Sequence, residues 1–131
     1  MNYTDRYELI QAALEAQQRA FCPYSNFPVG AAIRTGSGKI YQGVNVENAS
    51  FGLTLCAERV AAAGAVAAGD REFVAIAVVS QGGVTPCGAC RQFLAEFNPA
   101  LPIVMVDPQR PTEIEQTTLD VLLPSRFEGP T

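Results

Sequence analysis

The 131-residue chain has no histidine, no tryptophan and few basic residues, with 9 lysines and arginines against 13 aspartates and glutamates. Its formal net charge of -4 argues against a surface that gains affinity by neutralising many phosphates. Editing of single-stranded nucleic acid would need a positively charged groove with stacking aromatic side chains, which this composition disfavours. Polymeric nucleic acid is therefore not an expected partner.

Long apolar segments are also missing. No stretch approaches the length of a membrane span, and the first residues lack the basic and apolar segments of a secretory signal. The chain contains no linker rich in proline, glycine and serine, no internal repeat and no low-complexity tract. We therefore expect one soluble domain over residues 1–131, located in the cytoplasm and without a membrane partner.

The chain has 4 cysteines, which in a reducing compartment are more often metal ligands or free thiols than a disulfide framework. Cys22 is expected to be a packed thiol. Cys56, Cys87 and Cys90 could supply three thiolates to a catalytic zinc ion, which takes three protein ligands and keeps one position open for water. The absence of histidine leaves no obvious fourth ligand.

Local patterns predict the secondary structure around these cysteines. Asp5, a candidate N-cap with Glu8 three residues later, opens a pattern of apolar residues at helical spacing, which predicts a helix of about four turns. The prolines of the segment 22–28 predict a loop after it. The further predicted elements are an antiparallel hairpin of residues 29–34 and 40–46, a helix 56–68, a buried strand 73–80, a helix 91–97, a strand 103–106, an edge strand 112–116 and a short helix 118–123.

The order of these elements predicts the fold class. A strand, helix, strand crossover favours parallel neighbours, whereas the hairpin is antiparallel. We therefore expect a three-layer α/β/α fold with a mixed, roughly five-stranded sheet. In that fold, Cys56 and the pair Cys87 and Cys90 both stand at or near helix N-termini.

Glu58 follows Cys56 by two residues, so its carboxylate falls within the first turn of the same predicted helix. There it can face the open position of the metal as a general base without being a ligand. Three thiolates would leave zinc with a negative charge, which works against deprotonation of its water. The helix N-termini and Arg59, which we expect to donate to the thiolates, supply the compensating positive potential.

Cys56-Ala57-Glu58 together with Pro86-Cys87-Gly88-Ala89-Cys90 resembles the signature of zinc nucleobase deaminases. Over nearly the whole chain, the segments 23–32, 45–49 and 122–124 make the sequence similar to the small cytidine deaminases with an all-cysteine zinc site. The resemblance implies a cytidine deaminase-like fold, one zinc ion per subunit and a nucleoside substrate. It implies that a zinc-bound hydroxide attacks C4 of cytidine or 2'-deoxycytidine, while Glu58 shuttles the proton to N3 and then to the leaving ammonia.

The same resemblance assigns the substrate contacts. Asn45 and Glu47 match the clamp on the ribose 3'-hydroxyl, and the Ala57 amide and the Thr85 carbonyl read the edge of the base. Phe27 corresponds to an aromatic ring that packs on the pyrimidine.

Two other phenylalanines bear on assembly and selectivity. Phe127 corresponds to a residue contributed by a neighbouring subunit, which implies a homotetramer with shared active sites. Phe51 stands where many members of the family carry tyrosine, so a hydroxyl contact near the 5' side of the sugar is missing.

Other interpretations remain open from the sequence. The same zinc core would serve a deaminase of another small aminated heterocycle, although Asn45 and Glu47 argue for a nucleoside. A non-catalytic zinc module would need Glu58 or Asp107 as a fourth ligand. A thioredoxin-like redox protein would leave Cys56 and Glu58 without a role.

Overall fold

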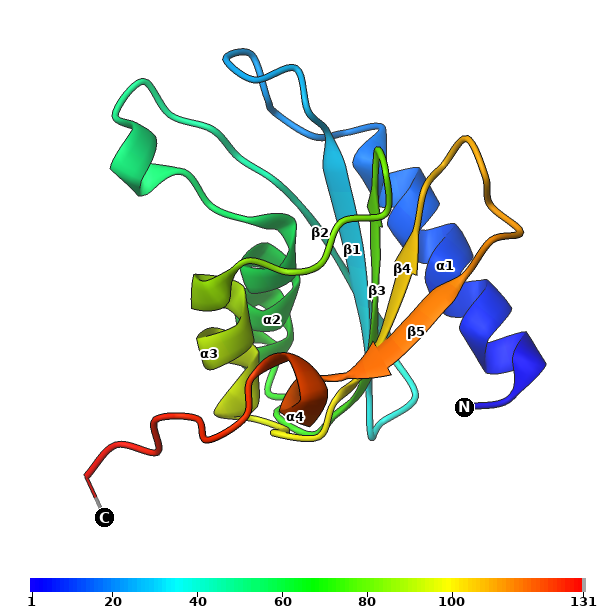
Figure 1. The fold of residues 1–131 in the computed structure, drawn as a ribbon, viewed down its shortest axis with the longest axis vertical. Coiled ribbons are helices and arrows are strands. Elements are labelled where there is room, and N and C mark those ends of the chain that lie inside the picture. The colour runs from blue at the N-terminus through cyan, green and yellow to red at the C-terminus, as the bar shows by residue number, and fades with distance from the viewer. Residues whose placement is uncertain (131) are drawn as a thin grey trace.

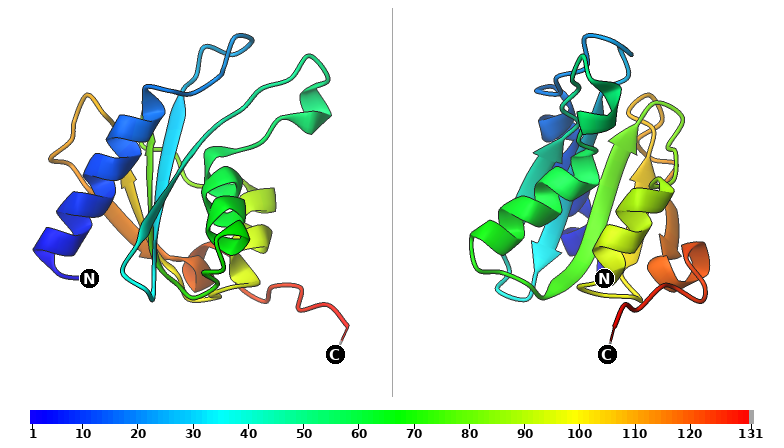
Figure 2. Two further views of the ribbon diagram at one scale, coloured as in Figure 1. Left: turned by 180° about the vertical axis from the view of Figure 1, so that it is seen from behind. Right: turned by 90° about the vertical axis from the view of Figure 1, so that its left-hand side faces the viewer.

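A five-stranded sheet separates one long helix from two shorter ones in the computed structural model, which describes residues 1–130 (Figures 1 and 2). Helix α1 covers one face of the sheet, and α2 and α3 lie together on the other. In chain order the elements are α1 (Tyr3–Gln17), β1 (Val29–Thr35), β2 (Ile40–Val44), the 3-10 helix η1 (Phe51–Leu53), α2 (Ala57–Ala67), β3 (Phe73–Ser80), α3 (Gly88–Ala95), β4 (Pro102–Val106), β5 (Glu115–Thr118) and α4 (Leu119–Leu122).

The strands lie in the order β2-β1-β3-β4-β5. Only β3 and β4 are parallel, and α3 forms the crossover between them. The predicted three-layer fold with a mixed sheet is confirmed. Because β3 and β4 are parallel, the segments that follow them emerge at the same edge of the sheet.

The start of α1 differs from the prediction. Asn2, and not Asp5, is the N-cap, because the Asn2 side chain accepts a hydrogen bond from the Asp5 backbone N–H at 2.8 Å. Both residue types cap helices well, and the earlier one captures the free amide, which leaves Asp5 in the first turn where the helix dipole favours a carboxylate.

Three further elements differ from the prediction by two residues or more at an end. Strand β2 ends at Val44, because Val46 leaves the ladder and pairs with Leu55 in an isolated bridge. Helix α3 begins at Gly88 and ends at Ala95, so it starts and stops earlier than predicted. The predicted strand 112–116 lies at Glu115–Thr118, because a turn in which Glu113 N–H bonds the Arg110 carbonyl precedes it.

Two hydrophobic cores fill the spaces between the layers. The core beneath α1 packs Leu9, Ile10 and Ala13 against alternate residues of the central strands. The core on the other face packs the alanines of α2 and Leu94 of α3 against the remaining strand residues. Within residues 1–130, no helix has both the length and the apolar character required to cross a membrane.

Two glycines let the helices approach the sheet closely. A Cβ atom at Gly43 of β2 would lie 2.2 Å from the Ala57 carbonyl oxygen and 2.5 Å from the Ala61 nitrogen. A Cβ atom at Gly30 of β1 would lie 2.1 Å from the Ala13 carbonyl oxygen. Since Ala57 opens α2 directly after Cys56, the absence of a side chain at Gly43 sets the position of the first turn of α2.

We predict that Gly43→Ala destabilises the protein by about 1–3 kcal/mol, the usual cost of forcing extra atoms into a packed contact. Gly64→Ala is the matched control, since Gly64 is exposed in the middle of α2 and a Cβ atom there meets nothing within 4 Å. The control should stabilise the helix by about 0.5–1 kcal/mol. Urea unfolding of the wild type and of both variants would measure their free energies of unfolding. A Gly43→Ala variant as stable as the wild type would show that α2 does not depend on the contact at Gly43.

Candidate metal centre and active site

The three predicted ligands lie at the N-termini of two helices. Cys56 is the N-cap of α2, Cys87 is the N-cap of α3, and Cys90 lies in the first turn of α3. Their three sulfur atoms lie within 4.8 Å of one another, and the Sγ atoms of Cys56 and Cys87 are 3.8 Å apart. Within residues 1–130, this is the only cluster of three side chains with such potential ligand atoms.

The charges around the sulfurs fit a bound cation. A hydrogen bond with the Cys90 thiol, helped by the Arg59 guanidinium and opposed by burial, lowers the pKa of the Cys56 thiol to about 5. The same contact with Cys56, together with burial, raises the pKa of the Cys90 thiol. Cys56 and Cys90 therefore do not ionise together on their own, and a divalent cation is the species that would allow it. Three thiolates suit one zinc ion with an open fourth position.

Arg59 makes the contact expected of it. Its Nη2 atom donates to the Cys56 sulfur at 3.4 Å, across one turn of α2. Its Nε atom is buried and has no hydrogen-bond partner among the described residues. The guanidinium thus places positive charge beside the thiol cluster.

Glu58 is buried beside the cluster, with only 4% of its surface exposed, and is the only buried charged residue within residues 1–130. Burial raises the pKa of its carboxyl group above the ordinary value. A carboxyl group held in such a place is suited to accept and return a proton.

A cavity of about 200 Å³ unites most of the predicted site. Glu58, Cys56 and Cys87 line it together with predicted substrate contacts. The predicted contacts in its lining are Asn45, Ala57 and Thr85, and the remaining lining residues are Val29, Thr54, Leu55, Val78 and Val84. The walls are mainly apolar, and the groups able to react or to form hydrogen bonds are few, as in small-molecule sites.

The two residues of the predicted ribose clamp line two different cavities. Asn45 is buried, and its side chain accepts from the Val29 N–H at 3.0 Å and donates to the Phe27 carbonyl at 2.9 Å. Glu47 lines a neighbouring cavity of about 240 Å³, and both cavities include Thr54. The two cavities therefore adjoin, one at the thiols and the other at Glu47.

The two predicted phenylalanine contacts lie outside the cavity lining. Phe27 belongs to the loop after α1, and Asn45 holds its backbone. Phe127 is 74% exposed on the C-terminal segment, where its carbonyl accepts from the Gln92 side chain. The C-terminal segment extends away from the layers (Figure 1), and Phe127 is not among the residues that line the cavity.

Arg91 is a residue of the site that the sequence reasoning missed. Its guanidinium donates to the Pro86 carbonyl at 2.8 Å, the Leu122 carbonyl at 2.8 Å and the Thr85 hydroxyl at 3.1 Å. It thereby fastens the segment before Cys87 to the end of α4. Its position next to Cys90 was the one available signal, but a sequence does not show which distant carbonyls an arginine meets.

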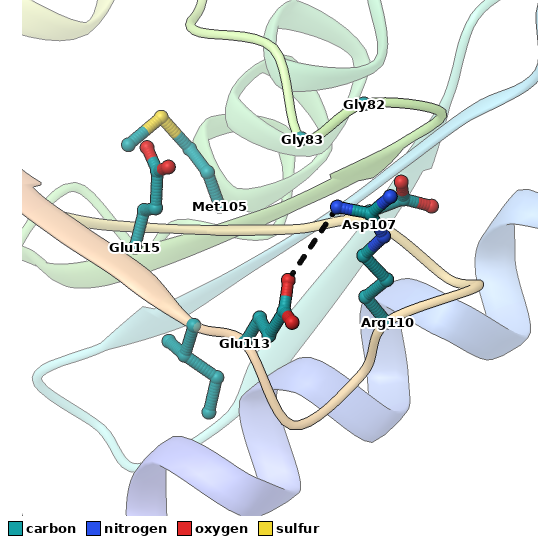
Figure 3. Close-up of a pocket in the computed structure, with 8 residues that line it drawn as sticks. Gly82, Gly83, Met105, Asp107, Arg110, Glu113 and Glu115 are labelled. Carbon is teal, nitrogen blue, oxygen red and sulfur yellow. Dashed lines mark ion pairs between the residues drawn. The ribbon is translucent and has the colours of Figure 1, made fainter.

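Another cavity, of about 360 Å³, lies at the carboxyl ends of β3 and β4 and has a different character (Figure 3). Asp107, Glu113 and Glu115 line it, and an ion pair of 3.8 Å joins Arg110 to Glu113. Asp107 accepts a hydrogen bond from Gln109 N–H and is not part of the thiol cluster. This position removes Asp107 as a fourth ligand to a metal held by the thiols.

Comparison with known proteins agrees with this geometry. The cytidine deaminase of Sporosarcina psychrophila is 46% identical over 126 residues, covering 94% of this chain and 91% of that protein. The cytidine deaminase of Halalkalibacterium halodurans is 46% identical over 125 residues, covering 94% of each. The crystal structure of the Burkholderia pseudomallei cytidine deaminase superposes with a TM-score of 0.89 at 48% identity, covering 97% of this chain and 100% of that one.

The profile of the family described as "Cytidine and deoxycytidylate deaminase zinc-binding region" matches residues 4–106, which include the three cysteines and Glu58. With the thiol cluster at two helix N-termini and the relatives above, the match shows that this chain belongs to the zinc-dependent cytidine and deoxycytidylate deaminases.

Proposed function

We propose that this enzyme deaminates cytidine and 2'-deoxycytidine hydrolytically, giving uridine and 2'-deoxyuridine with release of ammonia. The observation that carries the proposal is a buried carboxyl group, Glu58, in one small cavity with the thiols of Cys56 and Cys87. The relatives named above, which align over most of their own length, are cytidine deaminases. The role of this activity in the cell is salvage of pyrimidine nucleosides.

Cys56, Cys87 and Cys90 would hold the zinc ion, with Arg59 offsetting part of the charge of the thiolates. When bound, zinc acts as a Lewis acid that lowers the pKa of a water molecule at its open position. Glu58 would take a proton from the attacking water and pass it to N3 of the pyrimidine as the water oxygen adds to C4. It would then take the second proton of that oxygen, now the C4 hydroxyl, and deliver it to the amino group, so that the C4–N bond breaks and ammonia leaves. A single carboxyl can act twice as base and twice as acid because the attacking water supplies both protons.

The remaining cavity residues orient the nucleoside. The Ala57 amide and the Thr85 carbonyl read the edge of the base, and Phe27 packs on the pyrimidine. Asn45 and Glu47 bind the 3'-hydroxyl of the sugar, and hydrogen bonds from Ser25 and Tyr24 keep the pKa of Glu47 below its ordinary value. An ionised carboxylate accepts hydrogen bonds only, which suits it to receive a sugar hydroxyl.

The proposed assembly is a homotetramer with shared active sites. Supporting it are the exposed Phe127 and the exposed apolar side chains of two loops that project together beyond the sheet (Figure 2). These exposed side chains are Phe21, Tyr24, Val46, Phe51, Leu53 and Leu55. Tyr24 and Phe51 join the two loops through an edge-on ring contact of 5.7 Å. We propose that a second subunit covers these loops and contributes its own Phe127 to the site.

We further propose that residues 1–131 form one catalytic domain and that the enzyme works in the cytoplasm. Both hydrophobic cores share the same sheet, which supports a single folding unit. The ligand set consists of thiols, which remain available for zinc in a reducing compartment.

We expect the wild-type enzyme to convert cytidine and 2'-deoxycytidine but not free cytosine, and Glu58→Gln to lower kcat by about 10²-fold or more. The substitution keeps the shape of the side chain and removes its ability to move a proton. Absorbance of the pyrimidine during turnover, with zinc content measured in parallel, checks both expectations. Glu115→Gln, in the cavity of Figure 3, is the control and should match the wild type. Full activity of Glu58→Gln would remove Glu58 from the mechanism.

For the metal, we predict that Cys87→Ala abolishes stoichiometric zinc binding, because only two thiol ligands remain. Cys22→Ala should keep about one zinc ion per chain, since Cys22 is a free thiol outside the cluster. Elemental analysis of the purified variants decides between ligand and bystander. Stoichiometric zinc in Cys87→Ala would contradict the assignment.

For shared sites, we predict that Phe127→Ala folds and binds zinc but loses activity, and that mixing it with Glu58→Gln restores part of the activity. In a mixed oligomer the Glu58→Gln subunit supplies Phe127 to a neighbour that retains Glu58. Co-refolded variants, compared with the separately refolded proteins at equal concentration, provide the measurement. No gain on mixing would show that each subunit has a complete site.

A further inference from the structure

Three donors from one turn of the chain hold the Glu47 carboxylate. Its Oε1 atom accepts from the Tyr24 N–H at 2.9 Å and from the Ser25 N–H at 3.1 Å. Its Oε2 atom accepts from the Ser25 hydroxyl at 2.5 Å. The Ser25 hydroxyl also accepts from the Phe27 N–H at 3.1 Å, so a single oxygen atom joins the turn to the carboxylate.

The acceptor positions of the Glu47 carboxylate show where it can accept a further hydrogen bond. A carboxylate offers about four lone-pair positions, two on each oxygen. The two backbone amides fill Oε1, whereas the Ser25 hydroxyl fills one position of Oε2 and leaves the other open. Ser25, Glu47 and Thr54 line the same cavity of about 240 Å³, next to the cavity that contains Glu58. The open position of Glu47 is therefore the one beside Ser25.

We propose that Ser25 is a positioning residue that sets the selectivity of this enzyme for the sugar 3'-hydroxyl, by fixing which oxygen of Glu47 receives it. The proposal rests on the function proposed above, in which Glu47 binds the sugar. The Ser25 hydroxyl donates to Oε2 and so aims the free lone pair of that atom. Without the hydroxyl, Oε2 loses its only donor among residues 1–130, and the carboxylate can rotate about its last bond.

The backbone around this contact is already held in place by other bonds. Phe21 N–H donates to the Asn45 carbonyl at 3.0 Å, and Glu47 N–H donates to the Phe21 carbonyl at 2.9 Å. The loop therefore stays attached to the segment 45–47 when the Ser25 hydroxyl is removed. Loss of the hydroxyl is expected to affect the direction of the Glu47 carboxylate more than the fold.

The test compares Ser25→Ala with the wild type on 2'-deoxycytidine and on 2',3'-dideoxycytidine, which differ only in the 3'-hydroxyl. We expect KM for 2'-deoxycytidine to rise about tenfold, as for loss of one hydrogen bond to a charged group, with kcat unchanged. We expect no change in either constant for 2',3'-dideoxycytidine. Ser25→Thr, which retains a hydroxyl, should restore most of the lost affinity.

Ser37→Ala is the matched control. The Ser37 hydroxyl donates to an Asp70 carboxylate oxygen at 3.0 Å and accepts from the Lys39 N–H at 3.4 Å, the same pattern in the β1–β2 hairpin. Ser37→Ala should leave KM unchanged for both substrates.

Equal losses of Ser25→Ala on both substrates would overturn the proposal, because the serine would then only stabilise the loop. Equal KM values of the wild type for the two substrates would overturn it differently, by showing that Glu47 does not bind the 3'-hydroxyl. If the wild type deaminated neither nucleoside, the proposed function itself would have failed, and the role of Ser25 would fall with it.

Discussion

The close packing of three thiol groups at two helix N-termini is the constraint on which the rest of this structure depends. Sulfur atoms within 4.8 Å of one another, one of them buried, cannot all be ionised without positive charge nearby. The N-termini of α2 and α3, the guanidinium of Arg59 and the zinc ion of this family meet that requirement. Glu58 shares the same first turn of α2, so one helix N-terminus carries both a thiol of the cluster and the buried carboxyl group.

The sheet brings these helix ends together. Strand β3 leads into the segment that carries Thr85 and Cys87, and the hairpin places Gly43 beneath the first turn of α2. A side chain at Gly43 would collide with the Ala57 carbonyl, so the close approach of helix and strand requires glycine there. Arg91 then links the segment before Cys87 to the end of α4. Packing at Gly43 therefore positions the first turn of α2, and the contacts of Arg91 position the segment before Cys87.

Sequence reasoning anticipated the arrangement of residues where it depends on residue type and short spacing. Cys56 with Glu58, and Cys87 with Cys90, lie within single helical turns, so their relation follows from helix geometry alone. It did less well where several residues could do the same task. Asn2 and Asp5 are both good caps, and only the hydrogen bond between them shows which one caps α1. The contact of Arg91 with Leu122 and the contact of Ser25 with Glu47 each join segments far apart in the chain, and local patterns do not report such pairs.

By itself, the amino-acid sequence determined the order of the elements and the resemblance to small cytidine deaminases, and it predicted the three thiol ligands and the carboxyl group beside them. These depend on local periodicity and on residue chemistry, which a linear pattern contains. The tertiary structure alone decided that the three sulfurs meet, that Glu58 is buried in their cavity, that Asp107 lies in another cavity and that Ser25 holds Glu47. The physical reason is that burial and long-range hydrogen bonds arise from the packing of helices on a shared sheet, which brings together residues that are distant in the chain.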